Sequence, residues 1–347
     1  MLGVAVAVAA CGGKGKTGTT PTGTGSGSDQ SMKDPGDPTG TGGGTGSGAV
    51  PNPNGGGGSG AGPIGSPTDG PPVIPPNLDA DPAQAKAGVD AQLSIARAAL
   101  AAPTPDPDGA LRAARQALQI DAASVEAAAY IAFAYYHKRL YDTAELVLDD
   151  LFKRAAAKQN AMVFYVYGLV YDKTNRPERA QKAFEESVRL DPKHASALVN
   201  LGVYQLKNSQ YAAAQSTFET LTKQFGRNDA ITLTSLGSAY RGRSAEFPQG
   251  APDRDNYVRT AEASYKRALQ ASSNYGPAYY NLGLLYLDTD PYPGVTDAIQ
   301  RLTAAKSYFD QYKNMPNFDL KLYESRAKDV DKAIKRAQKK AKKPKTS

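Results

Sequence analysis

Residues 161–194 read AMVFYVYGLVYDKTNRPERAQKAFEESVRLDPKH, and residues 195–221 begin the same pattern again with ASALVNLGVYQLKNSQYAAAQSTFETL. The second copy starts 34 residues after the first. The residues that carry the pattern are Gly168, Tyr171, Ala180, Phe184 and Pro192 in the first copy, and Leu201, Gly202, Tyr211, Ala214 and Phe218 in the second. A repeat of about 20 to 50 residues indicates a solenoid of stacked units, each too small to bury its own apolar face.

This period and these residues resemble the tetratricopeptide repeat (TPR), a hairpin of two helices. In such a hairpin the Gly at position 8 and the Ala at position 20 lie where the two helices cross closely, and the aromatic residue at position 24 fills the adjoining space. The resemblance therefore implies an all-α fold, a TPR helix-turn-helix solenoid.

The same template extends in both directions with lower fidelity. It predicts about six repeats, and the further residues that carry them are Ala110, Ala114, Ala117, Ile131, Ala132, Tyr135, Tyr141, Ala144, Leu148, Leu236, Gly237, Tyr240, Ala261, Tyr265, Ala268, Gly276, Tyr279, Leu282, Gly283, Tyr286, Ala298, Leu302 and Ala305. The fifth repeat holds an insertion, expected as a Pro/Gly-rich loop over 244–256. The sixth breaks at residues 290–294. A last helix over about 318–341 has a polar outer side that suits the capping helix of a solenoid.

Composition divides the chain into four segments. Residues 1–11 form an apolar leader that ends in a cysteine, and 48 of the 69 residues in 12–80 are Gly, Pro, Thr or Ser, with no aromatic residue among them. Such a stretch buries no core and is expected to be a disordered low-complexity linker. The TPR solenoid is expected over 81–316, and the capping helix with a basic tail over 317–347.

The leader carries the most localised motif. Residues 2–10, LGVAVAVAA, have the length of a secretory h-region, too short to span a bilayer. They are followed by Val8-Ala9-Ala10-Cys11, which resembles the lipobox of bacterial lipoproteins; that resemblance implies cleavage before Cys11, lipidation of its thiol, and sorting to the outer membrane. No Lys or Arg precedes the apolar run, so we expect the natural start to lie further upstream. The alternative is that Cys11 is incidental.

The inner face of a TPR solenoid is lined mainly by positions 2, 5, 9, 12 and 13 of each first helix. This rule predicts a partner-binding groove, and we expect it to be apolar and aromatic and to hold a helix or an extended peptide. The predicted groove residues are Ala129, Phe133, Tyr136, Tyr165, Leu169, Lys173, Val199, Val203, Leu206, Tyr280, Leu284 and Leu287. The alternative is that these side chains pack against the inserted loop or the capping helix. Twenty tyrosines, all beyond residue 80, favour binding.

Little in the sequence favours catalysis. One cysteine and two histidines exclude a Cys/His zinc site and a Cys-His nucleophilic pair in the folded part, so we expect no metal, no cofactor and no enzymatic activity. His194 is expected in a solvated turn between repeats, and His137 at the end of a first helix facing the groove.

The net charge of +7 comes from one end of the chain. Ten Lys or Arg residues follow residue 325, against Asp329 and Asp331, so no basic face for nucleic acid is expected. The tail, with Lys339, Lys340, Lys342, Lys343 and Lys345, is either a solvated helix end or a contact for anionic lipid or acidic wall polymers.

Taken together, the chain resembles outer-membrane TPR lipoproteins of the bacterial cell envelope, facing the periplasm. Pilotin-type lipoproteins of type IV pilus secretins have a similar number of repeats, and gliding-motility complexes also contain TPR lipoproteins. The resemblance implies a scaffold that binds another envelope protein in its groove. The alternative is an accessory regulator of a cell-wall synthesis enzyme.

Overall fold

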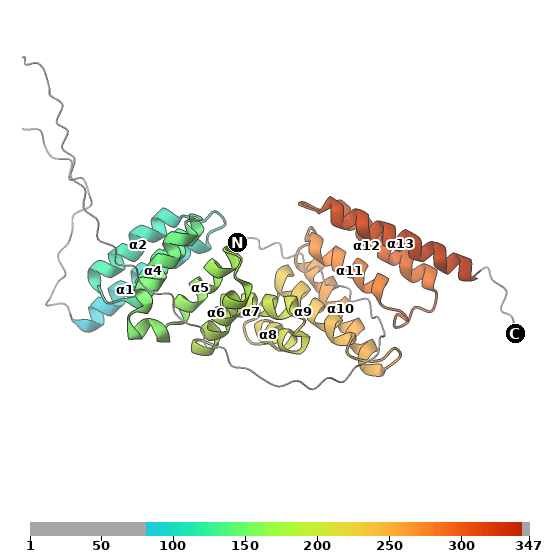
Figure 1. Cartoon of the computed structure of the whole chain (residues 1–347), viewed down its shortest axis with the longest axis horizontal. Helices are drawn as coiled ribbons and strands as arrows, with labels where there is room; N and C mark the ends of the chain where they lie inside the picture. Colours follow the sequence, from blue (N-terminus) through green and yellow to red (C-terminus); the bar gives the residue numbers. More distant parts are fainter. Residues whose placement is uncertain (1–80, 342–347) are drawn as a thin grey trace, which may run out of the picture. The chain divides into compact units, whose positions relative to one another are not determined.

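The computed structural model describes residues 81–341, and no strand occurs between those residues (Figure 1). Their helices in chain order are α1 (Pro82–Ala101), α2 (Pro107–Ile120), α3 (Val125–His137), α4 (Tyr141–Phe152), the 3-10 helix η1 (Ala155–Gln159), α5 (Ala161–Lys173), α6 (Pro177–Leu190), α7 (Ala195–Lys207), α8 (Tyr211–Lys223), α9 (Ala230–Ser244), α10 (Pro252–Ala271), α11 (Gly276–Asp288), α12 (Ala298–Lys313) and α13 (Leu320–Ala341). The prediction of an all-α fold is confirmed.

The helices pair as consecutive hairpins, from α1 with α2 to α11 with α12, and α13 packs on α12. Each hairpin also contacts the next one. The first helices form one layer, in which α3 contacts α1 and α5, and α9 contacts α7 and α11. This arrangement is the predicted TPR-like solenoid.

Glycines at the helix crossings explain the hairpins. A Cβ added to Gly168 would lie 2.5 Å from a ring carbon of Phe184, and one added to Gly202 would lie 2.7 Å from the ring of Phe218. Both rings are fully buried, so neither has room to move aside. The predicted contact between positions 8 and 24 of each repeat is therefore present, and only a residue without a side chain permits it at this distance.

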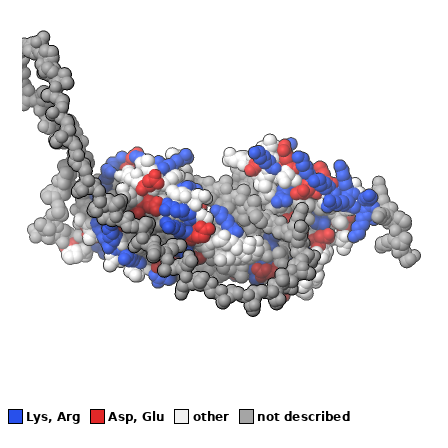
Figure 2. Space-filling view, viewed as in Figure 1, with Lys and Arg blue, Asp and Glu red and all other residues white. Residues whose placement is uncertain are grey.

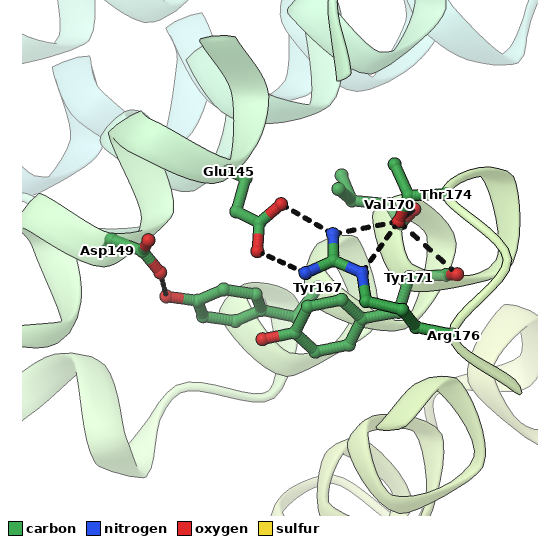
Figure 3. A network of polar contacts seen from close by, with 7 residues as sticks. All are labelled: Glu145, Asp149, Tyr167, Val170, Tyr171, Thr174 and Arg176. Carbon is green, nitrogen blue, oxygen red and sulfur yellow. Dashed lines mark hydrogen bonds and ion pairs between the residues drawn. The ribbon is translucent and has the colours of Figure 1, made fainter. Parts of the chain in front are cut away.

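Neighbouring hairpins are tied by polar contacts as well (Figure 3). The guanidinium of Arg176, at the start of α6, donates to both carboxylate oxygens of Glu145 on α4 at 2.7 and 2.5 Å and lies over the ring of Tyr171. Beside it, the Tyr167 hydroxyl donates to Asp149 at 2.7 Å. The same type of bond recurs in later repeats, from Tyr204 to Asp172, from Tyr240 to Glu219 and from Tyr286 to Glu262. Many tyrosines therefore serve the fold and not a binding surface.

The insertion in the fifth repeat differs from the loop expected over 244–256. Only residues 245–251 are outside helices, because α10 begins at Pro252, a residue favoured in the first helical turn. The added turn of α10 is held by Arg254, which is buried and donates to the carbonyl oxygens of Asp290 and Pro291. Six of the thirteen residues in 244–256 therefore lie in α9 and α10, and seven form the loop between them.

The last helix, α13, is amphipathic. Val330 is fully buried in a cluster with Tyr280, Phe309 and Tyr312, and the opposite side is charged. Figure 2 shows Lys and Arg gathered along this helix. Within residues 81–341, no helix has both the length and the apolar character that a bilayer crossing requires.

Candidate functional site

A concave groove of about 1140 Å³ runs along the layer of first helices, from α1 across α3, α5, α7 and α9 to the start of α11. Six of the twelve predicted groove residues line it: Phe133, Tyr136, Tyr165, Leu169, Val199 and Val203. The side chains come from different hairpins, so stacking of the repeats is what brings them together.

One row of the lining consists of helix N-caps. The side chains of Asn160, His194 and Asp229 accept hydrogen bonds from the backbone in the first turns of α5, α7 and α9, at 3.1, 3.2 and 3.0 Å. All three line the groove. The prediction missed this row, although the residue just before each first helix can be read from the repeat.

One end of the groove is aromatic. The ring centroid of Phe133 lies 5.8 Å from that of Tyr165 and 4.6 Å from that of His137. The ring centroids of Tyr165 and His194 are 4.6 Å apart. We call these four residues the aromatic seat. In all three of these ring pairs the planes are tilted or edge-on, so the rings form walls at angles to one another.

Burial sets the protonation state of the aromatic seat. It lowers the pKa of His137 and of His194 below the usual value of 6.5, so both rings are neutral at pH 7. It also raises the pKa of Tyr165 to about 12. The expectation that His194 is solvated is wrong, because its ring packs at an angle against Tyr165 and its Nδ1 accepts from the Ala197 amide. His137 faces the groove as predicted.

The other end of the groove is mainly polar, although Ile231 and Tyr275 also line it. We call Thr234, Ser235, Ser238 and Asn281 the polar end; all four line the groove. Thr234 and Ser238 occupy the same template positions on α9 that gave Tyr165 and Leu169 on α5, but the fifth repeat was left out of the prediction. The groove is therefore apolar and aromatic over only part of its length.

The polar end contains buried atoms without partners. Both Thr234 and Asn281 are 5% exposed. The Asn281 amide nitrogen donates to the Pro277 carbonyl at 2.8 Å, whereas Asn281 Oδ1 and Thr234 Oγ1 have no hydrogen-bond partner among residues 81–341. His137 Nε2, at the other end of the groove, is also buried and has no hydrogen-bond partner among these residues. Buried polar atoms of this kind are stabilised when a ligand supplies the missing bond.

Both arginines of the groove are paired within the protein, whereas the Asp191 carboxylate, also on the lining, accepts from the Lys193 amide and has no ion-pair partner among residues 81–341. Arg97 donates to the Tyr130 hydroxyl at 2.9 Å, and a nitrogen of its guanidinium lies 3.5 Å from a carboxylate oxygen of Glu126. The Arg227 Nε lies 3.1 Å from a carboxylate oxygen of Asp229. The groove thus offers ring faces, hydroxyls and amides, which are groups for non-covalent binding. No cluster of three His, Cys, Asp or Glu side chains suited to a metal ion occurs in the part of the chain that the structure describes.

The remaining predicted groove residues are not part of this lining. Ala129 and Leu206 are buried in the core. Lys173 lies at the end of α5, where it pairs with Asp172 at 3.2 Å. The structure therefore does not place these three residues on the groove lining.

The sixth repeat gives the clearest correction. Tyr280 and Leu284 are buried, and Leu287 packs on the same cluster, between α11, α12 and α13. Arg326 of α13 donates to the Tyr280 hydroxyl at 3.3 Å. The capping helix thus covers the positions that would otherwise continue the groove, as the alternative interpretation of these residues held.

Some predictions concern residues outside the described range. Cys11, the linker 12–80 and Lys342, Lys343 and Lys345 fall there. Lys339 and Lys340 are exposed in the last turn of α13. The groove geometry therefore does not test the predictions made for these residues.

Comparison with known proteins supports the fold. The family profile of the cilia and flagella-associated protein 70 middle TPR-like domain matches residues 152–274. In the solved structure of PilF from Pseudomonas aeruginosa, similarity extends over 71% of this chain and 99% of that one, with 19% identity and a TM-score of 0.50. At that identity the similarity shows the fold alone.

Two weaker similarities were found. PilW, described as a widely conserved type IV pilus biogenesis factor, is 20% identical over 64% of this chain and 95% of that one, with a TM-score of 0.45. A barley protein named probable UDP-N-acetylglucosamine–peptide N-acetylglucosaminyltransferase SPINDLY is 28% identical over 127 residues, 34% of this chain. The chain spans only 12% of that relative.

Proposed function

We propose that this protein is a non-catalytic interaction scaffold that holds a segment of a partner protein in the groove. The observation that carries the proposal is the groove itself, about 1140 Å³ in volume and lined by side chains from five consecutive first helices and the start of a sixth. A concavity of this length suits an extended chain or a helix better than a small compact ligand.

We further propose that the scaffold is lipid-anchored in the bacterial cell envelope, at the outer membrane and facing the periplasm. The lipobox-like residues before Cys11 support this. A flexible 69-residue linker would have a root-mean-square span of about 45 Å, which lets the solenoid stand clear of the membrane. The exposed Lys339 and Lys340 would add attraction to anionic lipid or wall polymers.

The proposed partner is a component of an envelope machine, either a pilus secretin or a motility complex. The second candidate, accessory regulation of a cell-wall synthase, uses the same groove, so identifying the partner separates the two.

Photo-crosslinking in cells tests the scaffold. A photoreactive phenylalanine analogue replaces Tyr165 in the groove or, as a control, Glu186 on α6, and captured proteins are identified by mass spectrometry. We expect one envelope protein to be captured from position 165 and not from 186. Equal capture from both positions, or none from either, would contradict binding in the groove.

A further inference from the structure

The two ends of the groove differ in the chemistry they present, and this difference specifies the partner. The aromatic seat combines rings from α3, α5 and the N-cap of α7, with centroids 4.6 to 5.8 Å apart. Val199 and Val203 of α7 follow on the way to α9. Walls of this kind accept a large apolar or aromatic side chain through ring contacts.

An acidic side chain is disfavoured at this end. Both histidines are neutral at pH 7, and the nearby Arg97 is already engaged by Tyr130 and Glu126. At the other end, Arg227 is paired with Asp229. A carboxylate entering the groove would lose its hydration without gaining an unpaired cation.

The polar end requires hydrogen bonds. Because the Asn281 amide nitrogen is used by Pro277, its Oδ1 is left as a buried acceptor that needs an N–H or O–H donor. The Thr234 hydroxyl belongs to the same lining, is also buried and has no partner in the described chain. An apolar ligand would leave both groups unsatisfied.

We infer that the groove recognises a two-part peptide segment without acidic residues: an aromatic side chain in the aromatic seat and, elsewhere in the segment, residues whose N–H or O–H groups bond to Thr234 and Asn281. This inference rests on the proposed function, because it names the partner chemistry for the same groove.

The test uses a phage library of random heptapeptides, selected at pH 7.5 against the full chain carrying Cys11→Ser. Selected peptides are synthesised and their Kd is measured by calorimetry. Four variants are compared: Phe133→Leu removes one ring of the seat, Thr234→Val removes the hydroxyl at nearly constant volume, Ser235→Trp fills the groove, and Ile95→Ala is an exposed control outside the groove. Circular dichroism confirms that each variant is folded.

We expect enrichment of peptides that contain one aromatic residue and no acidic residue. Phe133→Leu should weaken their binding about tenfold, as loss of an aromatic anchor does, and Thr234→Val should weaken it less while leaving the aromatic preference intact. Ile95→Ala should have no effect. Replacing the aromatic residue of the peptide by Asp should abolish measurable binding.

The outcomes distinguish failure of the proposed function from failure of the inference alone. If Ser235→Trp leaves peptide binding unchanged, or if no peptide is selected, the groove is not the binding site and the proposed function fails with the inference. If Ser235→Trp abolishes binding but the selected peptides are acidic or lack an aromatic residue, the groove binds peptides and only the inference is overturned.

Discussion

Single residues decide how closely the two helices of a hairpin approach. Gly168, Gly202, Gly237 and Gly283 each face the ring of a buried aromatic residue on the second helix. The second repeat has a different pair of residues at this helix crossing. Ala132 and Leu148 occupy the equivalent positions, and both are fully buried. A methyl group on the first helix is thus compatible with a smaller partner on the second.

Gly202→Ala is expected to lower the free energy of unfolding by about 1–3 kcal/mol, because the added Cβ would overlap the buried Phe218 ring. Urea denaturation followed by circular dichroism measures this. The double variant Gly202→Ala/Phe218→Leu copies the second repeat and should lose less than the sum of the two single changes. Strict additivity of the two changes would contradict a direct contact.

His194 is both an N-cap and a wall of the aromatic seat. Its Nδ1 accepts from Ala197 at 3.2 Å, which requires an unprotonated nitrogen, and protonation would also place a positive charge at a helix N-terminus. Burial lowers its pKa below 6.5 in the folded chain. The stability that depends on neutral His194 is therefore complete above pH 6.5 and is lost as pH falls toward the folded-state pKa.

The pH dependence should be visible in a matched variant. His194→Asn keeps an N-cap acceptor but does not titrate, so it should lose less stability than the natural chain between pH 7.5 and pH 5. Urea midpoints at both pH values give the comparison. Identical losses in the two proteins would show that protonation of His194 does not affect folding.

At the scale of elements, α13 closes the solenoid and shortens the groove. Its one fully buried side chain is Val330, which packs with Tyr280 and Phe309. Because this contact joins residues of α11 and α12 to a helix later in the chain, its loss should release α13 without unfolding the earlier repeats.

Val330→Asp is expected to destabilise the packing of α13 by about 2 kcal/mol or more, because a carboxylate would be buried without a partner. Limited proteolysis should then cut the segment 314–319 faster than in the natural chain. Lys332→Asp, at an exposed position of the same helix, is the control and should not change the cleavage rate. Equal cleavage in both variants would mean that Val330 does not hold the helix.

At the scale of the whole molecule, the proposed lipid on Cys11 and the basic side of α13 would act together at a membrane. Acyl chains contribute about 0.8 kcal/mol per buried methylene, and stable anchoring takes more than one chain or a second, electrostatic signal. The lipid would supply salt-independent retention, whereas the basic residues respond to ionic strength.

Cys11→Ser should therefore move the protein from the membrane fraction to the soluble fraction of the cell envelope. The measurement is fractionation followed by immunoblotting, before and after a wash with 1 M salt. Val6→Ser, a change upstream of the lipobox-like residues, serves as the control. Unchanged, salt-resistant retention of Cys11→Ser would refute lipid anchoring.

Much of the fold follows from local pattern. The 34-residue period, the small residues at positions 8 and 20 and the aromatic residue at position 24 predicted the helix hairpins and their crossings, and the structure contains those contacts at Gly168 and Gly202. These features are readable in one dimension because a hairpin is formed by residues close in sequence, and each solenoid unit contacts only its neighbours.

The extent of the groove depends on packing between distant segments, and only the tertiary structure decided it. Tyr280 fits the groove template as well as Tyr165 does, yet Arg326, 46 residues later, donates to its hydroxyl, and α13 covers it. His194 had the sequence context of a turn, but stacking of α7 against α5 brought it onto Tyr165. A repeat template assigns a position to each side chain, whereas burial of apolar area by a later helix determines which positions stay open.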